Sequence, residues 1–260
     1  MSQSVALETE FPQVADVQCP PTDLWSDEPP LESDFHRDQI DLLIQLLRWW
    51  WRDRQDVYIS GNLTIYYNEE QLKSRDFRGP DFFVVFGTEN KPRKSWVVWG
   101  ENGQYPNLIV EILSASTAKV DRGLKKELYQ NTFRTPEYFL FDPQDFTLEG
   151  FQLLKGHYEP IQPNAQSYLW SEQLGLYLGK HDNKLRFFTA QGQLISSPEE
   201  RAEQEQQRAE QERQRAEQER QRAEQERQRA EQERQRAEQA EAQLALLRAQ
   251  MKAQGIEPQS

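Results

Sequence analysis

The chain has 260 residues, 36% of them hydrophobic, and a formal net charge of -12 at pH 7. A strongly acidic surface repels phosphate backbones, so this charge excludes a general nonspecific nucleic-acid binder and leaves only a local contact with nucleic acid. A single cysteine, Cys19, excludes an intramolecular disulfide and a thiolate zinc cluster. No run approaches the roughly 20 apolar residues of a membrane span, and the N-terminus lacks the basic flank and apolar stretch of a signal peptide. We therefore expect a soluble, cytoplasmic protein without a membrane partner.

Residues 1–31 form an acidic lead that is rich in proline. This segment has few periodic apolar positions, which predicts a flexible lead or an irregular wrap. The apolar residues that can build a core lie between residues 32 and 197. We expect this range to be the folded domain.

The domain begins with a predicted amphipathic helix. Ser33 can cap it, and Ile40, Leu43 and Leu47 recur at spacings of three and four residues. The tryptophan cluster 49–51 stands at the end of this helix. Core and rim packing is the expected role of the cluster, and stacking on nucleic-acid bases is the alternative.

Short apolar runs after this helix predict β-strands. The first group comprises Val57–Ser60, Leu63–Tyr67, Phe82–Phe86, Trp96–Trp99 and Leu108–Leu113. A tight turn at Gly61 and Asn62 can connect the first two strands.

A helix over Asp121–Phe133 and a strand over Tyr138–Phe141 are expected to follow, with Pro136 separating them. Further strands are expected around Leu148–Leu154, Tyr158–Ile161 and Leu185–Thr189. This order predicts an α+β or mixed α/β domain with a mostly antiparallel front half.

Residues 198–254 repeat RAEQERQ with a period of seven, and a short tail, 255–260, follows. The period is that of a coiled coil, but the second core position of each heptad is glutamate until Ala240 and Leu247 replace it. Charge pairs three and four residues apart favour a solitary helix. A homodimeric coiled coil, aided by Leu244 and Met251, and a disordered segment are the alternatives.

Glu111 is the most unusual residue of the apolar strands. It stands within PNLIVEILSAS, where five apolar neighbours indicate a fully buried strand. Burying an unpaired carboxylate costs several kcal/mol. We therefore expect a metal ion, a cationic side chain or a catalytic task to accompany Glu111.

Asp81 is the natural companion of Glu111. It precedes the buried strand of RGPDFFVVFG, directly after a Gly-Pro turn. Taken alone, it reads as a turn aspartate that bonds its own backbone. Two acids on successive strands of one sheet, however, form an oxygen site of the kind that Mg²⁺ prefers.

A phosphodiesterase also needs a cationic side chain near the scissile phosphate. Leu113 occupies the position two after Glu111, on the same strand face. Asp121, Lys125 and Tyr129 fall at i, i+4 and i+8 of the next helix, so Lys125 can point back toward the strand ends. A solvated helix surface is the alternative for Lys125, and Lys119 is a weaker candidate cation.

The segments GPDFFVVFG, LIVEILSAST, VDRGLKKELYQ and PEYFLFDP, in this order, resemble the Uma2 family of endonucleases within the PD-(D/E)xK superfamily. The resemblance covers about residues 30 to 195. It implies a restriction-endonuclease-like core with a central mixed sheet flanked by helices.

The resemblance also implies a site and a reaction. Its catalytic residues are Asp81, Glu111 and Lys125, supported by Asp121 and Tyr129. The implied metal is Mg²⁺ or Mn²⁺, held by the two acids and the backbone carbonyl of Ile112, and the implied substrate is DNA. The superfamily often adds an acid on the first helix, and Glu32 and Asp38 are the candidates here.

A second function stays open at this point. The acidity and the long repeat also suit a noncatalytic interaction protein, in which a nuclease-like core binds a partner and the helix acts as a spacer or an oligomerisation element. A homodimer through the core or the helix is compatible with both functions.

Overall fold

The computed structural model describes residues 21–26, 33–68 and 79–253. The chain divides after Ser197 into a first unit, Met1–Ser197, and a second unit, Pro198–Ser260. All strands of the described residues lie in the first unit, and the described part of the second unit is a long helix.

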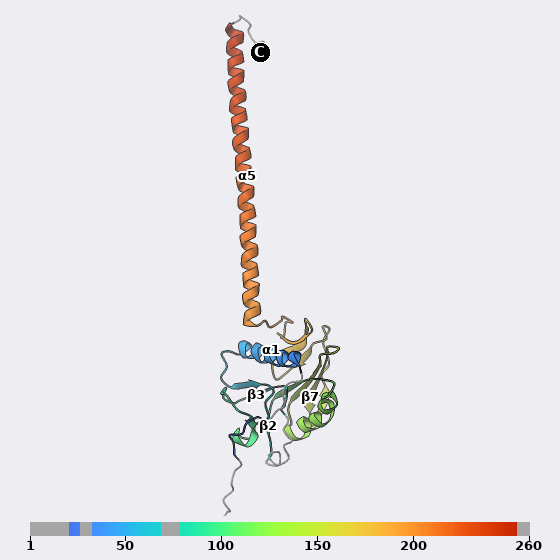
Figure 1. Ribbon diagram of the computed structural model, residues 1–260. Coiled ribbons are helices and arrows are strands. Elements are labelled where there is room, and N and C mark those ends of the chain that lie inside the picture. Colours follow the sequence, from blue (N-terminus) through green and yellow to red (C-terminus); the bar gives the residue numbers. More distant parts are fainter. Residues whose placement is uncertain (1–20, 27–32, 69–78, 254–260) are drawn as a thin grey trace, which may run out of the picture. The chain divides into compact units, whose positions relative to one another are not determined.

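A six-stranded mixed sheet forms the centre of the first unit (Figure 1). The pair β5 and β6 is parallel, and the other neighbours are antiparallel. The predicted mixed sheet with an antiparallel front half is thus confirmed. In spatial order the strands are β1 (Val57–Ser60), β3 (Phe82–Phe86), β5 (Leu108–Ile112), β6 (Glu137–Asp142), β7 (Thr147–Leu154) and β8 (His157–Pro160).

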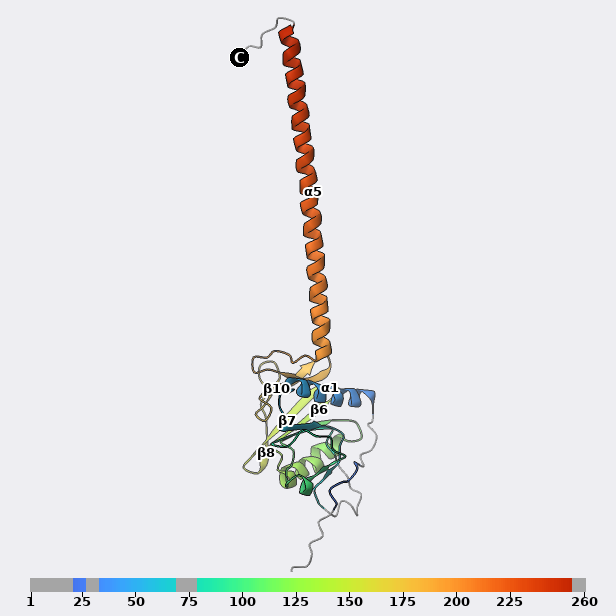
Figure 2. The same cartoon turned by 90° about the vertical axis from the view of Figure 1, so that its left-hand side faces the viewer.

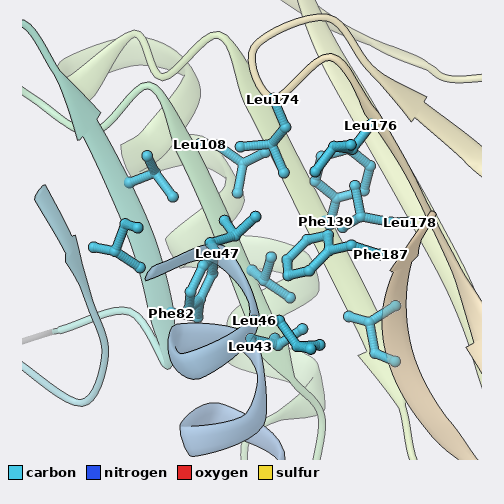
Figure 3. Close-up of a cluster of buried hydrophobic side chains, with 14 of the residues drawn as sticks. Leu43, Leu46, Leu47, Phe82, Leu108, Phe139, Leu174, Leu176, Leu178 and Phe187 are labelled. Carbon is cyan, nitrogen blue, oxygen red and sulfur yellow. The ribbon is translucent and has the colours of Figure 1, made fainter. Parts of the chain in front are cut away.

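Helix α1 (Asp34–Trp50) packs on one face of this sheet. It begins as predicted, because the Ser33 hydroxyl accepts a hydrogen bond from the backbone N–H of His36 at 3.2 Å. Figure 3 shows Leu43, Leu46 and Leu47 of this helix among the aromatic and aliphatic side chains of the sheet. Burial of this apolar stripe fixes α1 against the strands.

A continuous helix over residues 118–133 covers the opposite face (Figure 2). It consists of α3 (Ala118–Val120), η2 (Asp121–Lys125), α4 (Lys126–Leu128) and η3 (Tyr129–Phe133), of which η2 and η3 are π-helical. Successive strand residues point to opposite faces. Phe83 and Ile109 therefore meet this helix, whereas Phe82 and Val110 meet α1.

A three-stranded sheet packs on the α1 side of the unit, in the order β11 (Lys184–Phe188), β10 (Leu176–His181) and β9 (Leu169–Ser171). Sequence reasoning found β11 and missed the other two strands. The side chain of Gln39 on α1 bonds the edge of β11: its amide donates to the Leu185 carbonyl at 3.0 Å and accepts from the Leu185 N–H at 2.9 Å. This buried amide satisfies an otherwise open strand edge.

Replacing Gln39 with leucine should lower the free energy of unfolding by about 1–3 kcal/mol, because the Leu185 N–H and C=O then stay buried without partners. Urea denaturation measures the change. Gln45→Leu on the exposed side of α1 is the matched control and should leave stability nearly unchanged. Equal midpoints for both variants would contradict this role of Gln39.

Two local predictions were wrong. The expected strand Trp96–Trp99 is only β4 (Trp96–Val97), which pairs in parallel with β2 (Ile65–Tyr66) and continues as the short helix η1 (Val98–Gly100). The turn at Gly61 closes no hairpin, because β1 and β2 lie in different sheets.

The described part of the N-terminal lead, residues 21–26, runs along the β4 region. The Ser26 N–H donates to the Lys94 carbonyl at 3.0 Å, and the Ser95 hydroxyl donates to the Leu24 carbonyl at 2.6 Å. An irregular wrap thus describes these six residues. The rest of the predicted lead lies outside the described residues.

The second unit contains helix α5 (Pro198–Ala253), and every residue of this helix is at least partly exposed. Its glutamines bond glutamates one turn earlier: Gln214 to Glu210 at 3.1 Å, and Gln221 to Glu217 at 3.3 Å. These contacts recur with the seven-residue period and stabilise the predicted long charged helix from within. Among the described residues, no helix combines the length and apolarity needed to cross a membrane.

Candidate active site

Asp81 and Glu111 meet where the pairing of β3 with β5 ends. The last paired residues are Phe82 and Val110, so Asp81 follows in register beside Glu111. The Asp81 N–H donates to Glu111 Oε2 at 3.2 Å, and the Ile112 N–H donates to Asp81 Oδ2 at 2.7 Å. Each acid is thus fixed by a backbone amide of the neighbouring chain segment.

Glu111 is fully buried and has three hydrogen-bonding partners. The Tyr129 hydroxyl donates to Oε1 at 2.8 Å, and Lys125 Nζ lies 3.0 Å from Oε2, the oxygen that also accepts from the Asp81 N–H. Lys125 is therefore the cationic side chain that compensates the buried charge. Its ammonium also lies 3.0 Å from Asp121 Oδ1.

The geometry of the 118–133 helix brings Asp121, Lys125 and Tyr129 together. In a regular α-helix a residue eight positions further on is rotated by about 80°, given 3.6 residues per turn. Because η2 and η3 are π-helical, the helix turns less per residue. Lys125 and Tyr129 therefore both reach Glu111.

The site contains more carboxyl groups, those of Asp81, Glu111 and Asp121, than ammonium groups, of which Lys125 provides one. Burial lowers the pKa of Lys125, but the charges of Glu111, Asp121 and Asp81 outweigh it and raise the pKa above its ordinary value. Lys125 is therefore protonated at neutral pH. Burial, followed by the charge of Glu111, raises the pKa of Tyr129, so its hydroxyl keeps its proton and donates.

Burial also raises the pKa of Glu111, against the influence of Lys125 and with a further contribution from Asp81 and Asp121. Burial is the main cause of this shift. Separately, the one ammonium of Lys125 faces the three carboxyl groups of Asp81, Glu111 and Asp121, which is an imbalance in the number of acidic and basic groups. A further cation at this point would relieve the imbalance.

The carboxylates fit a divalent metal ion by their chemistry and charge. Asp81 and Glu111 present oxygen donors at one point, and hard cations such as Mg²⁺ take oxygen ligands. The described residues contain no group of three or more His, Cys, Asp or Glu side chains already spaced to hold a metal. The fit therefore rests on the two acids and on the excess negative charge.

The other residues considered from the sequence have different surroundings or are not described. Leu113 is buried in the apolar cluster under the 118–133 helix, and Lys119 is exposed. Asp38 is 62% exposed and contacts Arg37, and Glu32 lies outside the described residues.

His36 is the residue of the first helix that reaches the acids. Its Nε2 lies 2.9 Å from Asp81 Oδ2, and its side chain is 8% exposed. Sequence reasoning missed this residue. The available signal was its position one turn before Ile40, on the apolar stripe of α1, where a histidine is buried and needs a polar partner.

The geometry can be set beside known proteins. A crystal structure of a putative nuclease belonging to DUF820 from Anabaena variabilis ATCC 29413 is similar at 15% identity and a TM-score of 0.42, covering 58% of this chain and 80% of that one. No curated protein matches the chain. Residues 23–180, more than half of the chain, match the Uma2 family, described as "Putative restriction endonuclease". The chain therefore belongs to the Uma2 family.

Proposed function

We propose that the chain is an endonuclease that hydrolyses DNA phosphodiester bonds with the help of Mg²⁺ or Mn²⁺. The observation that carries this proposal is the meeting of Asp81, Glu111 and Lys125 through contacts of 3.2 Å and 3.0 Å. Membership of the Uma2 family supports it independently.

Asp81 and Glu111, with the backbone carbonyl of Ile112, would hold the metal ion. The bound ion supplies polarisation of the phosphate and lowers the pKa of a water molecule. The backbone amides of Asp81 and Ile112 keep the two carboxylates in place before any ligand arrives.

Lys125 is the catalytic cation of the proposal. It keeps its proton at neutral pH, so its ammonium can orient the attacking water or neutralise the charge that develops on the phosphate. Asp121 holds the ammonium from the second side, and Tyr129 fixes Oε1 of Glu111. These two residues support the site without taking part in bond breaking.

The protein's net charge of -12 restricts how DNA can approach. Long-range attraction by the whole surface is excluded, so affinity must come from contacts near the site. We therefore expect weak, strongly salt-dependent binding in the absence of a divalent ion.

Cleavage of supercoiled plasmid DNA tests the proposal. Wild-type protein should cut with Mg²⁺ or Mn²⁺ and stop when EDTA is added. Asp81→Asn and Glu111→Gln should each reduce the rate at least about 100-fold, which corresponds to about 2.7 kcal/mol of transition-state stabilisation.

Asp38→Asn is the matched control, because it neutralises an exposed carboxylate on α1 and should leave the rate unchanged. Undiminished cutting by Asp81→Asn and Glu111→Gln would disprove the site. A wild-type protein without metal-dependent cleavage or thermal stabilisation would favour the noncatalytic interaction protein, in which α5 acts as a spacer.

A further inference from the structure

We propose that His36 is a positioning residue that fixes the Asp81 carboxylate for metal binding. This inference rests on the proposed function, to which it adds a residue from a different part of the fold. His36 lies on α1, whereas Glu111 lies on β5 and Lys125 on the 118–133 helix. The site is thus assembled from both faces of the sheet.

Two nitrogen atoms from different elements contact the same oxygen of Asp81. The Ile112 N–H of β5 lies 2.7 Å from Oδ2, and His36 Nε2 of α1 lies 2.9 Å from it. A carboxylate that is held at one oxygen from two directions cannot rotate about its side-chain bonds without losing a contact. In this proposal, the other oxygen, Oδ1, takes the metal ion.

His36 is itself firmly placed. The Ser33 side chain caps the first turn of α1 by accepting from the His36 N–H at 3.2 Å. The imidazole is almost fully buried, and the Asp81 side chain is only 16% exposed. The 2.9 Å approach of His36 Nε2 to Asp81 Oδ2 places the buried ring directly against the carboxylate.

The first turn of α1 also lies close to the Asp81 carboxylate. Backbone N–H groups at a helix N-terminus carry a partial positive charge, which stabilises a nearby carboxylate. Because Asp81 contacts His36 in this first turn, its carboxylate lies near the N-terminal end of α1. Groups of this kind, behind a metal ligand, typically change metal affinity or activity 10- to 100-fold.

Calorimetric titration with Mn²⁺, without DNA, tests the inference in the full-length chain. His36→Leu removes the ring nitrogen that contacts Asp81 while keeping the bulk of the side chain, and it should weaken Mn²⁺ binding by about 10- to 100-fold. His36→Gln can place an amide N–H near the same position and should recover much of the affinity. In the cleavage assay, kcat should follow this order while KM for DNA stays unchanged.

Gln39→Leu is the matched control. It removes a buried polar side chain from the same helix, but one that bonds Leu185 rather than an acid. It should lower stability and leave the Mn²⁺ affinity unchanged. A purely structural role of His36 would make His36→Leu behave in the same way.

The outcomes separate this inference from the proposed function. Absence of Mn²⁺ binding by the wild-type protein would overturn the proposed function and, with it, this inference. Normal binding by the wild-type protein together with equal affinity in His36→Leu would overturn the role of His36 alone. Equal loss in His36→Leu and His36→Gln would also overturn it, because an amide donor would then have no effect.

Discussion

Replacing Lys125 with methionine should abolish DNA cleavage and lower the free energy of unfolding of the metal-free protein by about 3–5 kcal/mol. The ammonium lies 3.0 Å from both Glu111 and Asp121, which are almost completely buried. Its removal leaves two buried acids without a cation, whereas the methionine retains most of the packing volume. Loss of activity and loss of stability therefore have the same electrostatic cause.

In this variant, metal ions should increase stability but should not restore activity. Mn²⁺ should stabilise Lys125→Met more than the wild-type protein, because the added cation meets uncompensated carboxylates. It should not restore cleavage, because the positive charge beside the reacting phosphate is missing. Urea denaturation with and without Mn²⁺ measures the first effect, and plasmid cleavage measures the second.

Lys119→Met is the control for the lysine. Lys119 is exposed and precedes the π-helical turns, so its replacement should change neither stability nor cleavage. If Lys119→Met were inactive and Lys125→Met active, the role of catalytic cation would pass to Lys119.

Replacing Gly61 with alanine should both destabilise the domain and reduce cleavage. A Cβ atom at this position would lie 2.2 Å from the Asp81 carbonyl oxygen and 2.6 Å from Cγ2 of Ile40. The first contact is with backbone, which cannot swing aside as a side-chain end can. The Asn62 N–H also bonds the Asp81 carbonyl, at 3.1 Å, so the turn cannot simply move away.

Overpacking of this kind costs about 1–3 kcal/mol of stability. Relief of the clash requires movement of Asp81, and misplacement of a reacting group by about 1 Å can reduce a rate about 100-fold. Thermal unfolding and the cleavage rate measure the two effects.

Gly123→Ala is the control for the glycine. A Cβ atom at Gly123 meets nothing within 4 Å, so this variant should keep full activity. Unchanged cleavage by Gly61→Ala would show that Asp81 tolerates displacement, which would weaken its assignment as a metal ligand.

The amino-acid sequence predicted the main components of the candidate site. Glu111 was identified because a charged residue interrupts an apolar strand, and Asp81 because it stands at the start of another buried strand, earlier in the chain. Lys125 and Tyr129 followed from their spacing on one helix. All four lie within one network of contacts, in which Asp121 also takes part.

The remaining features depend on contacts between distant parts of the chain. His36 acquires its partner only when α1 packs beside the start of β3, and no local pattern encodes that approach. The π-helical turns were likewise not predicted, because the spacing of Asp121, Lys125 and Tyr129 reads as that of an ordinary α-helix.

The missed strand β10 has a physical explanation. Its sequence, LYLGKH, contains Gly179, and a glycine inside a strand weakens both its β-propensity and its alternating pattern. A Cβ atom at Gly179 would lie 2.2 Å from the Tyr168 ring, so the strand needs this glycine for packing. Packing against Tyr168 therefore requires Gly179, and this same glycine obscures the strand pattern in the sequence.

The clustering of Asp81, Glu111, Asp121 and Lys125 makes the domain less stable than its packing would allow. Replacing a buried ion network with apolar residues of similar volume is often neutral or stabilising by about 1–4 kcal/mol. The domain thus carries an electrostatic cost from folding onward, which the proposed metal ion would offset. Thermostable variants of this protein should accordingly be sought among substitutions that leave these four residues intact, because the simplest gains in stability would remove the proposed catalytic groups.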